Sequence, residues 1–296
     1  MKLTEIICVL LLLLHIPYLR AQEADELSVL RQKAAADKSL KGYSDVCRYL
    51  YEKEERPELL SLYADTIRQL GVSTKSSDCF IEFYIWKSEA CFIRGDYEDG
   101  YALKRKAITL AEKIGSKKYI ATCSSDMGYY FNVDMQYDSA RYYFKKGMAA
   151  VIDIPGFAET YRTMLTNYAS SFLFEGKTDS ALVYTIRAAE RSTVDKDTAM
   201  LIENLNQLGT IYRRKKNLEQ CIANFEKAFR LCEAQNNYRI AAYIYGNIAT
   251  AYCDWSRPKD AIPFSEKAVE YAIKLGNRQM EGICYVNLGA IQCNMA

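Results

Sequence analysis

The chain has almost no histidine. His15 is the single one among 296 residues, and it lies in an apolar segment at the N-terminus. Histidine supplies the base of most nucleophilic triads and dyads and is the commonest zinc ligand, so the rest of the chain cannot form such sites. The motifs GxGxxG, GxxxxGK[ST] and HExxH are also absent. The sequence therefore predicts no enzyme, no metal site and no cofactor.

An excess of charge of one sign is also lacking. Lysine and arginine number 39, aspartate and glutamate number 37, and the pI is about 7.9. A balanced chain gives no electrostatic reason for general nucleic-acid binding. We therefore expect no nucleic-acid partner for this segment.

Long apolar runs are missing except at the N-terminus. Lys2 precedes the apolar run 6–14, Pro17 follows it, and Ala21 ends a small-residue cleavage pattern. This layout is typical of a secretory signal peptide over residues 1–21. An uncleaved membrane anchor is the alternative, although the run is short for a membrane span. We expect the protein to be exported from the cytoplasm.

What the chain does have is a repeat with a period near forty residues. Acidic residues follow a turn at spacings of 40, 40, 41 and 40: Glu58, Glu98, Asp138, Asp179 and Glu219. A small or aliphatic residue comes two positions later each time: Leu60, Gly100, Ala140, Ala181, Cys221 and Ala261. A fixed period of this length indicates stacked supersecondary units that bury each other's apolar faces.

Each unit is predicted to be two helices joined by a tight turn. Gly95 ends one first helix, because glycine favours the left-handed conformation that closes a helix. Pro57 and Pro258 fall at the same repeat position, where a second helix begins. Small residues recur in the first helices, where they allow close helix contact: Ser88, Gly128, Ala169, Gly209, Ala249 and Gly289.

Together these residues resemble the tetratricopeptide repeat. The fifth unit carries the resemblance most fully, with Leu208-Gly209, Tyr212, Cys221, Phe225 and Ala228. The family's early tryptophan is absent, and a period near 40 exceeds the usual 34. The resemblance implies an all-α fold, a right-handed superhelical solenoid of antiparallel helix pairs. Long-period variants are similar to kinesin light chains and to exported bacterial sensor and regulator proteins.

The repeat also sets the predicted domain organisation. After the signal peptide, residues 22–43 are expected to form a capping helix, and residues 44–296 a solenoid. The solenoid holds six complete repeats and the first helix of a seventh, which begins near Met280. That unpartnered apolar helix predicts that the sequence is a fragment of a longer protein, or that its open end pairs with another copy.

Ten cysteines in an exported chain raise the question of disulfides. No CxxC spacing occurs, and nine cysteines remain after the signal peptide. Cys91 and Cys221 occupy repeat positions that hold alanine or an aromatic residue elsewhere. Free cysteine packs as a small hydrophobe, so we expect mostly buried thiols. One or two disulfides remain the alternative.

A row of amide side chains is the main candidate site. Two residues before the small residue of four first helices come Asn167, Gln207, Asn247 and Asn287. The resemblance implies that first helices line a concave groove, where an amide can donate to and accept from a peptide backbone. Hydrogen bonding between neighbouring first helices is the alternative. Further groove candidates are Ser170, Thr210, Arg213, Tyr243 and Thr250.

Two basic runs are expected to be solvated surface. The run 213–216 closes a first helix, where positive charge suits the helix end, and the run 104–106 lies on a second helix. Arg213 could instead pair with a carboxylate of a ligand.

The predicted function is therefore a non-catalytic scaffold that binds a protein or an extended peptide in the groove. We expect it in the periplasm or on the extracytoplasmic face of the inner membrane of a bacterium. It is expected to be the sensory input region of a larger membrane-associated signalling protein. The alternatives are a stand-alone periplasmic assembly scaffold, or a regulator whose missing C-terminal part is a DNA-binding or histidine kinase module. Membrane contact is expected only through an uncleaved N-terminus or a missing C-terminal span, and end-to-end self-association is a further expectation.

Overall fold

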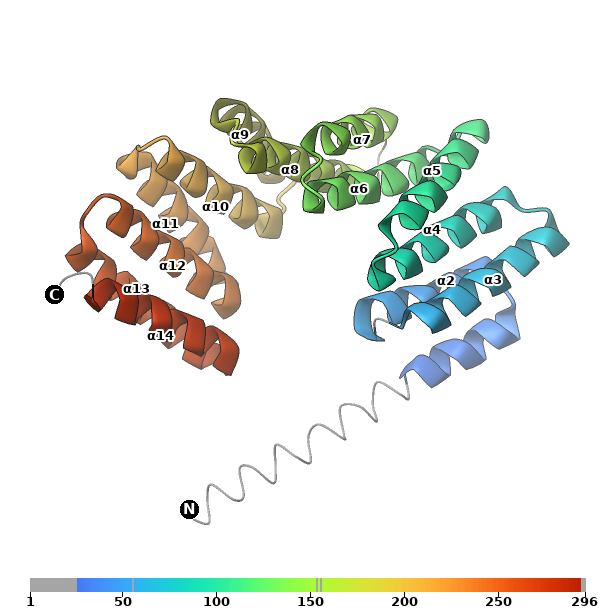
Figure 1. The fold of residues 1–296 in the computed structure, drawn as a ribbon, viewed down its shortest axis with the longest axis horizontal. Coiled ribbons are helices and arrows are strands. Elements are labelled where there is room, and N and C mark those ends of the chain that lie inside the picture. Colours follow the sequence, from blue (N-terminus) through green and yellow to red (C-terminus); the bar gives the residue numbers. More distant parts are fainter. Residues whose placement is uncertain (1–25, 55, 153, 155, 294–296) are drawn as a thin grey trace, which may run out of the picture. The chain divides into compact units, whose positions relative to one another are not determined.

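The computed structural model describes residues 26–54, 56–152, 154 and 156–293, and every regular element in these residues is helical (Figure 1). The prediction of an all-α fold is confirmed. A first helix covers residues 26–37. The remaining elements are α2 (Leu40–Tyr49), the π-helical η1 (Leu50–Glu54), α3 (Pro57–Thr74), α4 (Ser77–Arg94), α5 (Tyr97–Lys113), α6 (Lys117–Val133), α7 (Tyr137–Val151), α8 (Ala158–Glu175), α9 (Thr178–Val194), α10 (Thr198–Arg214), α11 (Leu218–Ala234), α12 (Tyr238–Asp254), α13 (Pro258–Leu275) and α14 (Arg278–Cys293).

The helices form two compact units that divide between Cys123 and Ser124, within α6. In the N-terminal unit α4 packs against both α3 and α5. In the C-terminal unit each helix from α8 to α13 packs on the helix before it and on the helix after it. There α8 also contacts α10, α10 contacts α12, and α12 contacts α14. The first helices of successive repeats therefore form a layer of their own.

The N-terminal region differs from the expected single capping helix. The predicted signal peptide, residues 1–21, lies outside the described residues. The helix over 26–37 ends before Lys38, whose φ is +43°, and α2 begins at Leu40. Ser39 starts the new helix because its Oγ accepts a hydrogen bond from the Gly42 N–H at 3.1 Å. The last residues of the predicted capping helix thus belong to α2.

The predicted turn chemistry is confirmed at both kinds of helix end. Pro57 and Pro258 are the first residues of α3 and α13. Proline is suited to this position because its missing N–H would have no partner there. Gly95 and Gly176 end α4 and α8 with φ of +82° and +86°, a conformation that costs glycine little.

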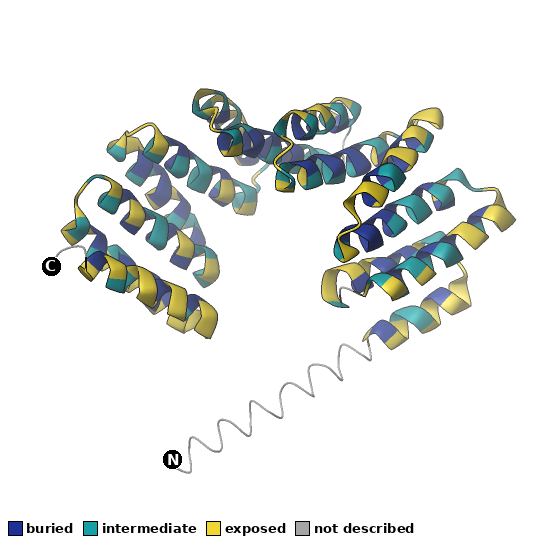
Figure 2. Cartoon of the chain, viewed as in Figure 1, coloured by how far each residue is buried: buried dark blue, intermediate teal, exposed yellow. Residues whose placement is uncertain are grey.

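Close contact between the two helices of a repeat depends on glycine facing phenylalanine. A Cβ atom added at Gly128 would lie 2.5 Å from the Phe144 ring, and one added at Gly209 would lie 2.5 Å from the Phe225 ring. Both rings are fully buried, so neither can move aside. The buried residues follow the sides on which successive helices pack (Figure 2). The predicted packing role is confirmed for Gly128 and Gly209, and it is wrong for Gly289 on α14, where an added Cβ atom would meet nothing within 4 Å.

The cysteines of the described residues are all free thiols, and seven of the nine are buried. The prediction of mostly buried thiols is confirmed. Burial raises the pKa of Cys221 and of Cys232 to about 11. These two side chains are therefore protonated at neutral pH and serve as core residues rather than nucleophiles.

One basic residue was wrongly assigned to the solvated surface. Lys104 is fully buried in the N-terminal unit and forms an ion pair with the buried Glu89 of α4. Its neighbours Arg105 and Lys106 are exposed, as expected. A run of three charges spans almost a full helical turn, so one member can face inward.

The last helix, α14, packs on α13 and leaves an apolar surface open. Ile283, Tyr285 and Val286 are 51%, 54% and 71% exposed.

No helix among the described residues is long and apolar enough to span a membrane.

The glycine contact predicts a stability difference between two similar substitutions. Gly209→Ala places a methyl group against a buried ring, and we expect a loss of about 1–3 kcal/mol in the free energy of unfolding. Gly246→Ala adds the same group in open space on α12, and we expect a gain of about 0.5–1 kcal/mol from reduced backbone entropy. Urea denaturation measures both. Equal effects would contradict the packing account.

The buried ion pair predicts non-additive substitutions. Lys104→Met leaves the Glu89 carboxylate buried without its cation, so we expect a loss of about 3–5 kcal/mol in the free energy of unfolding. Combining Lys104→Met with Glu89→Leu removes both charges and should recover most of that loss. Denaturation of the single and double variants tests this, and a double variant that loses as much as the two single losses added together argues against the pair.

Candidate functional site

The amide row does not form one continuous ladder. Gln207 on α10 donates from Nε2 to Ser170 Oγ on α8 at 2.9 Å. Asn247 on α12 donates from Nδ2 to Asn206 Oδ1 on α10 at 2.9 Å. These two amides therefore make the bonds between first helices that were the alternative to peptide binding.

The two outer members of the row lie differently. The backbone carbonyl of Asn167 accepts a hydrogen bond from Asn132 Nδ2 at 3.2 Å, and its side chain is half-buried. Asn287 on α14 is exposed. The first three members of the row are thus half-buried, and only Asn287 is exposed.

The hydroxyl candidates bond to their own helices. Ser170 Oγ donates to Thr166 O at 3.0 Å, and Thr250 Oγ1 donates to Gly246 O at 2.8 Å. Thr210 Oγ1 likewise donates to a carbonyl one turn earlier at 3.1 Å. Such bonds satisfy the hydroxyl proton and leave oxygen lone pairs for other donors.

The basic run that closes α10 is exposed at Arg214, Lys215 and Lys216, as expected, and it also connects neighbouring repeats. Arg213 Nη1 lies 3.4 Å from an oxygen of Asp254, at the end of α12. Arg214 Nη1 donates to the Leu173 carbonyl on α8 at 2.5 Å, and Lys215 pairs with Asp179. The guanidinium of Arg213 thus already has a carboxylate partner within the chain.

A cavity of about 550 Å³ opens on the layer of first helices, between α8, α10 and α12. Its lining comes from these three helices and from the turn before α10: Glu159, Asp197, Ala199, Met200, Glu203, Asn206, Ile240, Tyr243 and Asn247. Two predicted site residues, Tyr243 and Asn247, meet here. Tyr243 is 58% exposed, which leaves its ring available to a ligand.

Three acidic residues of this cavity were not predicted from the sequence. Asp197 is held by an arginine, whereas Glu159 and Glu203 make no ion pair among those the structure describes. The side chain of Glu203 is exposed at the surface. The surrounding protein nevertheless removes part of the water around its carboxyl group, which raises the pKa of Glu203 above its ordinary 4.5. The cavity therefore combines amides with uncompensated negative charge.

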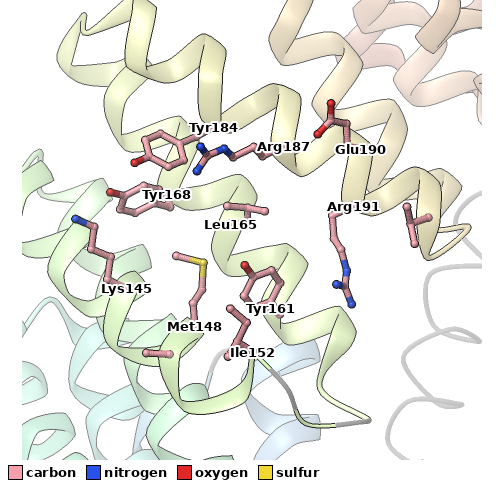
Figure 3. Close-up of a pocket in the computed structure, with 12 residues that line it drawn as sticks. Lys145, Met148, Ile152, Tyr161, Leu165, Tyr168, Tyr184, Arg187, Glu190 and Arg191 are labelled. Atoms are coloured by element: carbon pink, nitrogen blue, oxygen red, sulfur yellow. The ribbon is translucent and has the colours of Figure 1, made fainter.

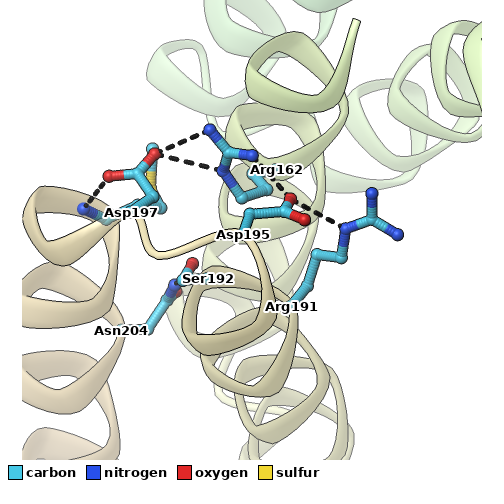
Figure 4. A network of polar contacts seen from close by, with 7 residues as sticks. Arg162, Arg191, Ser192, Asp195, Asp197 and Asn204 are labelled. Atoms are coloured by element: carbon cyan, nitrogen blue, oxygen red, sulfur yellow. Dashed lines mark hydrogen bonds and ion pairs between the residues drawn. The ribbon is translucent and has the colours of Figure 1, made fainter. Parts of the chain in front are cut away.

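An arginine network fixes one wall of this cavity (Figure 4). Arg162 of α8 donates from Nη1 to Asp195 at 2.5 Å, and from Nη2 to Asp197 at 2.8 Å. Asp197 in turn accepts a hydrogen bond from the Met200 N–H at 3.0 Å, which caps α10. One guanidinium thus ties α8 to the start of the next first helix.

Beneath the network lies a buried amide. Asn204 Oδ1 accepts from Thr166 Oγ1 at 3.0 Å, and its Nδ2 donates to Ser192 Oγ at 3.2 Å. All three side chains are buried, so α8, α9 and α10 are held in a fixed arrangement. Among the described residues no cluster of histidine, cysteine and acidic side chains could hold a metal ion.

The network predicts a pH-dependent stability difference. The hydrogen bond from Arg162, followed by that from Arg191, lowers the pKa of Asp195 below its ordinary 3.8. This contribution to stability is present above the ordinary value and is lost as the pH falls through the lowered pKa. We expect Arg162→Gln to be less stable than the parent by a constant margin above about pH 5, and by a shrinking margin below pH 3.8. Urea denaturation from pH 7 to pH 2.5 tests this, with Arg187→Gln as the control that shows no such trend.

The comparisons with known proteins agree with this architecture. Residues 199–274 match the family model described as tetratricopeptide repeat. No curated protein matches the chain in sequence. The match covers α10 to α13, which include two walls of the cavity.

Several solved structures share the fold. BtubC (BKLC) from P. vanneervenii is 16% identical with a TM-score of 0.65, over 76% of this chain and 92% of that one. Aspartyl phosphate phosphatase F from Bacillus subtilis is 12% identical with a TM-score of 0.68, over 90% and 77%. The Rap conjugation gene regulator of plasmid pLS20, in complex with the Phr* peptide, is 11% identical with a TM-score of 0.57, over 90% and 78%.

At these identities the likeness establishes the fold and not an activity. The family match and the helix pairs confirm the resemblance that the sequence motifs indicated. Residues 199–274 match tetratricopeptide repeats in sequence, and the helix pairs of the described residues have a tetratricopeptide-like fold.

Proposed function

We propose that the C-terminal unit binds an extended peptide on its first-helix layer, as a non-catalytic scaffold, and that nucleic acid is not its partner. The cavity between α8, α10 and α12 carries this proposal. Its amides suit a peptide backbone, which needs both donors and acceptors along its length. The Rap regulator of similar fold, solved with the Phr* peptide, supports a peptide as the class of ligand.

The lining of the cavity favours a positively charged side chain in the peptide. Glu159 and Glu203 supply uncompensated carboxylates, and Tyr243 offers an exposed ring. An arginine or lysine could pair with a carboxylate while its aliphatic stem lies along the apolar residues Met200 and Ile240.

Peptide binding would replace hydrogen bonds between neighbouring first helices with hydrogen bonds to the peptide. Asn247 and Gln207 already donate to neighbouring first helices. A peptide carbonyl that replaces Asn206 or Ser170 as acceptor gives a net gain of only about 0.5–1.5 kcal/mol per bond. Affinity would therefore come mainly from the carboxylates and from apolar contact, and the amides would set the register of the peptide.

We also propose that the protein is exported and acts outside the cytoplasm, as the sensory input region of a larger signalling protein. The signal-peptide pattern of residues 1–21 supports export. The open apolar surface of α14 supports coverage by a further helix or by a second copy. A stand-alone scaffold and a regulator with a C-terminal output module are the alternatives, and the coding sequence beyond Ala296 separates them.

Export predicts a processed protein outside the cytoplasm. We expect the chain, expressed in a bacterium with its N-terminus intact, to appear in the periplasm with a mass that lacks residues 1–21. Mass spectrometry of the fractionated protein measures this. An uncleaved chain in the cytoplasmic fraction would rule out export.

Peptide binding in the cavity between α8, α10 and α12 predicts which variants lose affinity for the peptide. A peptide selected from a random display library should bind Asn247→Ala roughly 3–10-fold more weakly and Glu203→Gln at least about tenfold more weakly. Gln220→Ala changes an exposed amide on α11, outside the cavity, and should leave affinity unchanged. Calorimetric titration measures all three, with circular dichroism to confirm helix content. Full affinity in both cavity variants would place the site elsewhere.

The raised pKa of Glu203 adds a pH signature to the same titration. Its carboxylate begins to protonate at a pH above its ordinary 4.5, so affinity for a cationic peptide should fall in that range. The Glu203→Gln variant should lack this part of the pH dependence. If the parent and the variant respond identically to pH, the carboxylate does not contact the ligand.

A further inference from the structure

A second cavity lies among α7, α8 and α9 and has the opposite charge. Its volume is about 580 Å³. Figure 3 shows the side chains that line it. The lining residues come from three helices: Lys145, Met148, Ala149 and Ile152 from α7 and the residue after it, Tyr161, Leu165 and Tyr168 from α8, and Tyr184, Arg187, Glu190, Arg191 and Val194 from α9. None of them lines the cavity between α8, α10 and α12, because α8 turns a different side towards each of the two cavities.

Three cations of this cavity each lie over a tyrosine ring. Arg187 Cζ is 5.4 Å from the centre of the Tyr184 ring. Arg191 Cζ lies 5.7 Å from the Tyr161 ring, and the amine of Lys145 lies 5.7 Å from a third ring, that of Tyr168. A ring holds a cation in place without neutralising its charge. The cations are thus positioned for an anion that arrives from outside.

Little negative charge opposes them. Arg191 is paired with Asp195 at 2.9 Å, but the structure gives no ion pair to Lys145 or Arg187 among the residues it describes. Glu190 is the one acid in the lining. Two cations therefore remain available to a ligand.

The tyrosines make the rest of the cavity flat and apolar. The rings of Tyr168 and Tyr184 meet edge to face, with centres 4.8 Å apart. Burial raises the pKa of Tyr168 to about 12, so its hydroxyl stays neutral. Leu165 is a buried residue of the lining, and Ile152, also in the lining, is 56% exposed. A planar apolar group could lie against these side chains.

We propose that this cavity binds a small amphipathic anion: a carboxylate attached to one flat, apolar body. The carboxylate would pair with Arg187, which offers a planar fork of donors, while Lys145 adds a second charge. The apolar body would lie on the tyrosine rings and Leu165. The volume is in the range of small-molecule sites, and three helices bound it, which favours one small ligand over a polypeptide segment.

The proposal is independent of peptide binding on the other side of α8. We would titrate the purified full chain with 3-phenylpropionate, with its neutral amide 3-phenylpropionamide, and with propionate. We expect saturable one-to-one binding of 3-phenylpropionate, at least about tenfold weaker binding of the amide, and none of propionate. Isothermal calorimetry and ligand-observed NMR measure these affinities.

A matched pair of variants locates the site. Arg187→Gln should weaken 3-phenylpropionate binding by roughly tenfold or more. Lys227→Gln removes a cation at the same repeat position on α11, outside the cavity, and should bind as the parent does. Both side chains are exposed, so neither change should disturb folding.

Three results would overturn the proposal: no saturable binding of 3-phenylpropionate, equal affinity for the acid and its amide, or full affinity in Arg187→Gln. Peptide affinity in the groove should be the same in Arg187→Gln and in the parent. Failure of one site is therefore distinguishable from failure of the other.

Discussion

The structure depends on how closely the two helices of a repeat can approach. In the repeats of Gly128 and Gly209 the first helix has no side chain where a buried phenylalanine ring of the second helix lies. A methyl group at either glycine would collide with a ring that close-packed neighbours hold in place. This contact is local to each repeat, and its recurrence lets one short pattern set the geometry of a whole layer of helices.

Neighbouring repeats are joined by hydrogen bonds and ion pairs between polar side chains. Arg162 bridges α8 to the turn before α10, and Asn204 joins α8, α9 and α10 through buried hydroxyls. These bonds fix how α8 stands against α10. The two cavities of the C-terminal unit share α8, one lined by carboxylates and amides and the other by tyrosines and cations. The negative charge of the first cavity would favour a cationic ligand, and the positive charge of the second would favour an anion.

The fold was largely predictable because its signals are local and repeated. Proline at the start of α3, glycine at the end of α4 and small residues at one packing position each have a physical meaning that does not depend on distant residues. The bounds near the N-terminus were less predictable, since one helix ends before Lys38 and Ser39 caps the next helix, which begins at Leu40.

The site was only partly predictable. The row position of Asn247 could be read from the period, but its bond to Asn206 depends on side-chain rotation between repeats. Glu203 lies four residues before Gln207 on α10, and only the packing of α12 beside it reveals a shared cavity. Lys104 was misplaced for the same reason, because its partner Glu89 belongs to the preceding helix. Composition shows which charges exist, and tertiary contacts decide which are buried.

The most direct test of a peptide-binding first-helix layer is a crystal structure of the chain with a selected peptide. The account predicts an extended peptide across α8, α10 and α12, with its backbone hydrogen-bonded to Asn247 and a basic side chain beside Glu203. A peptide bound against α9, α11 and α13, with the cavity between the first helices empty, would contradict it.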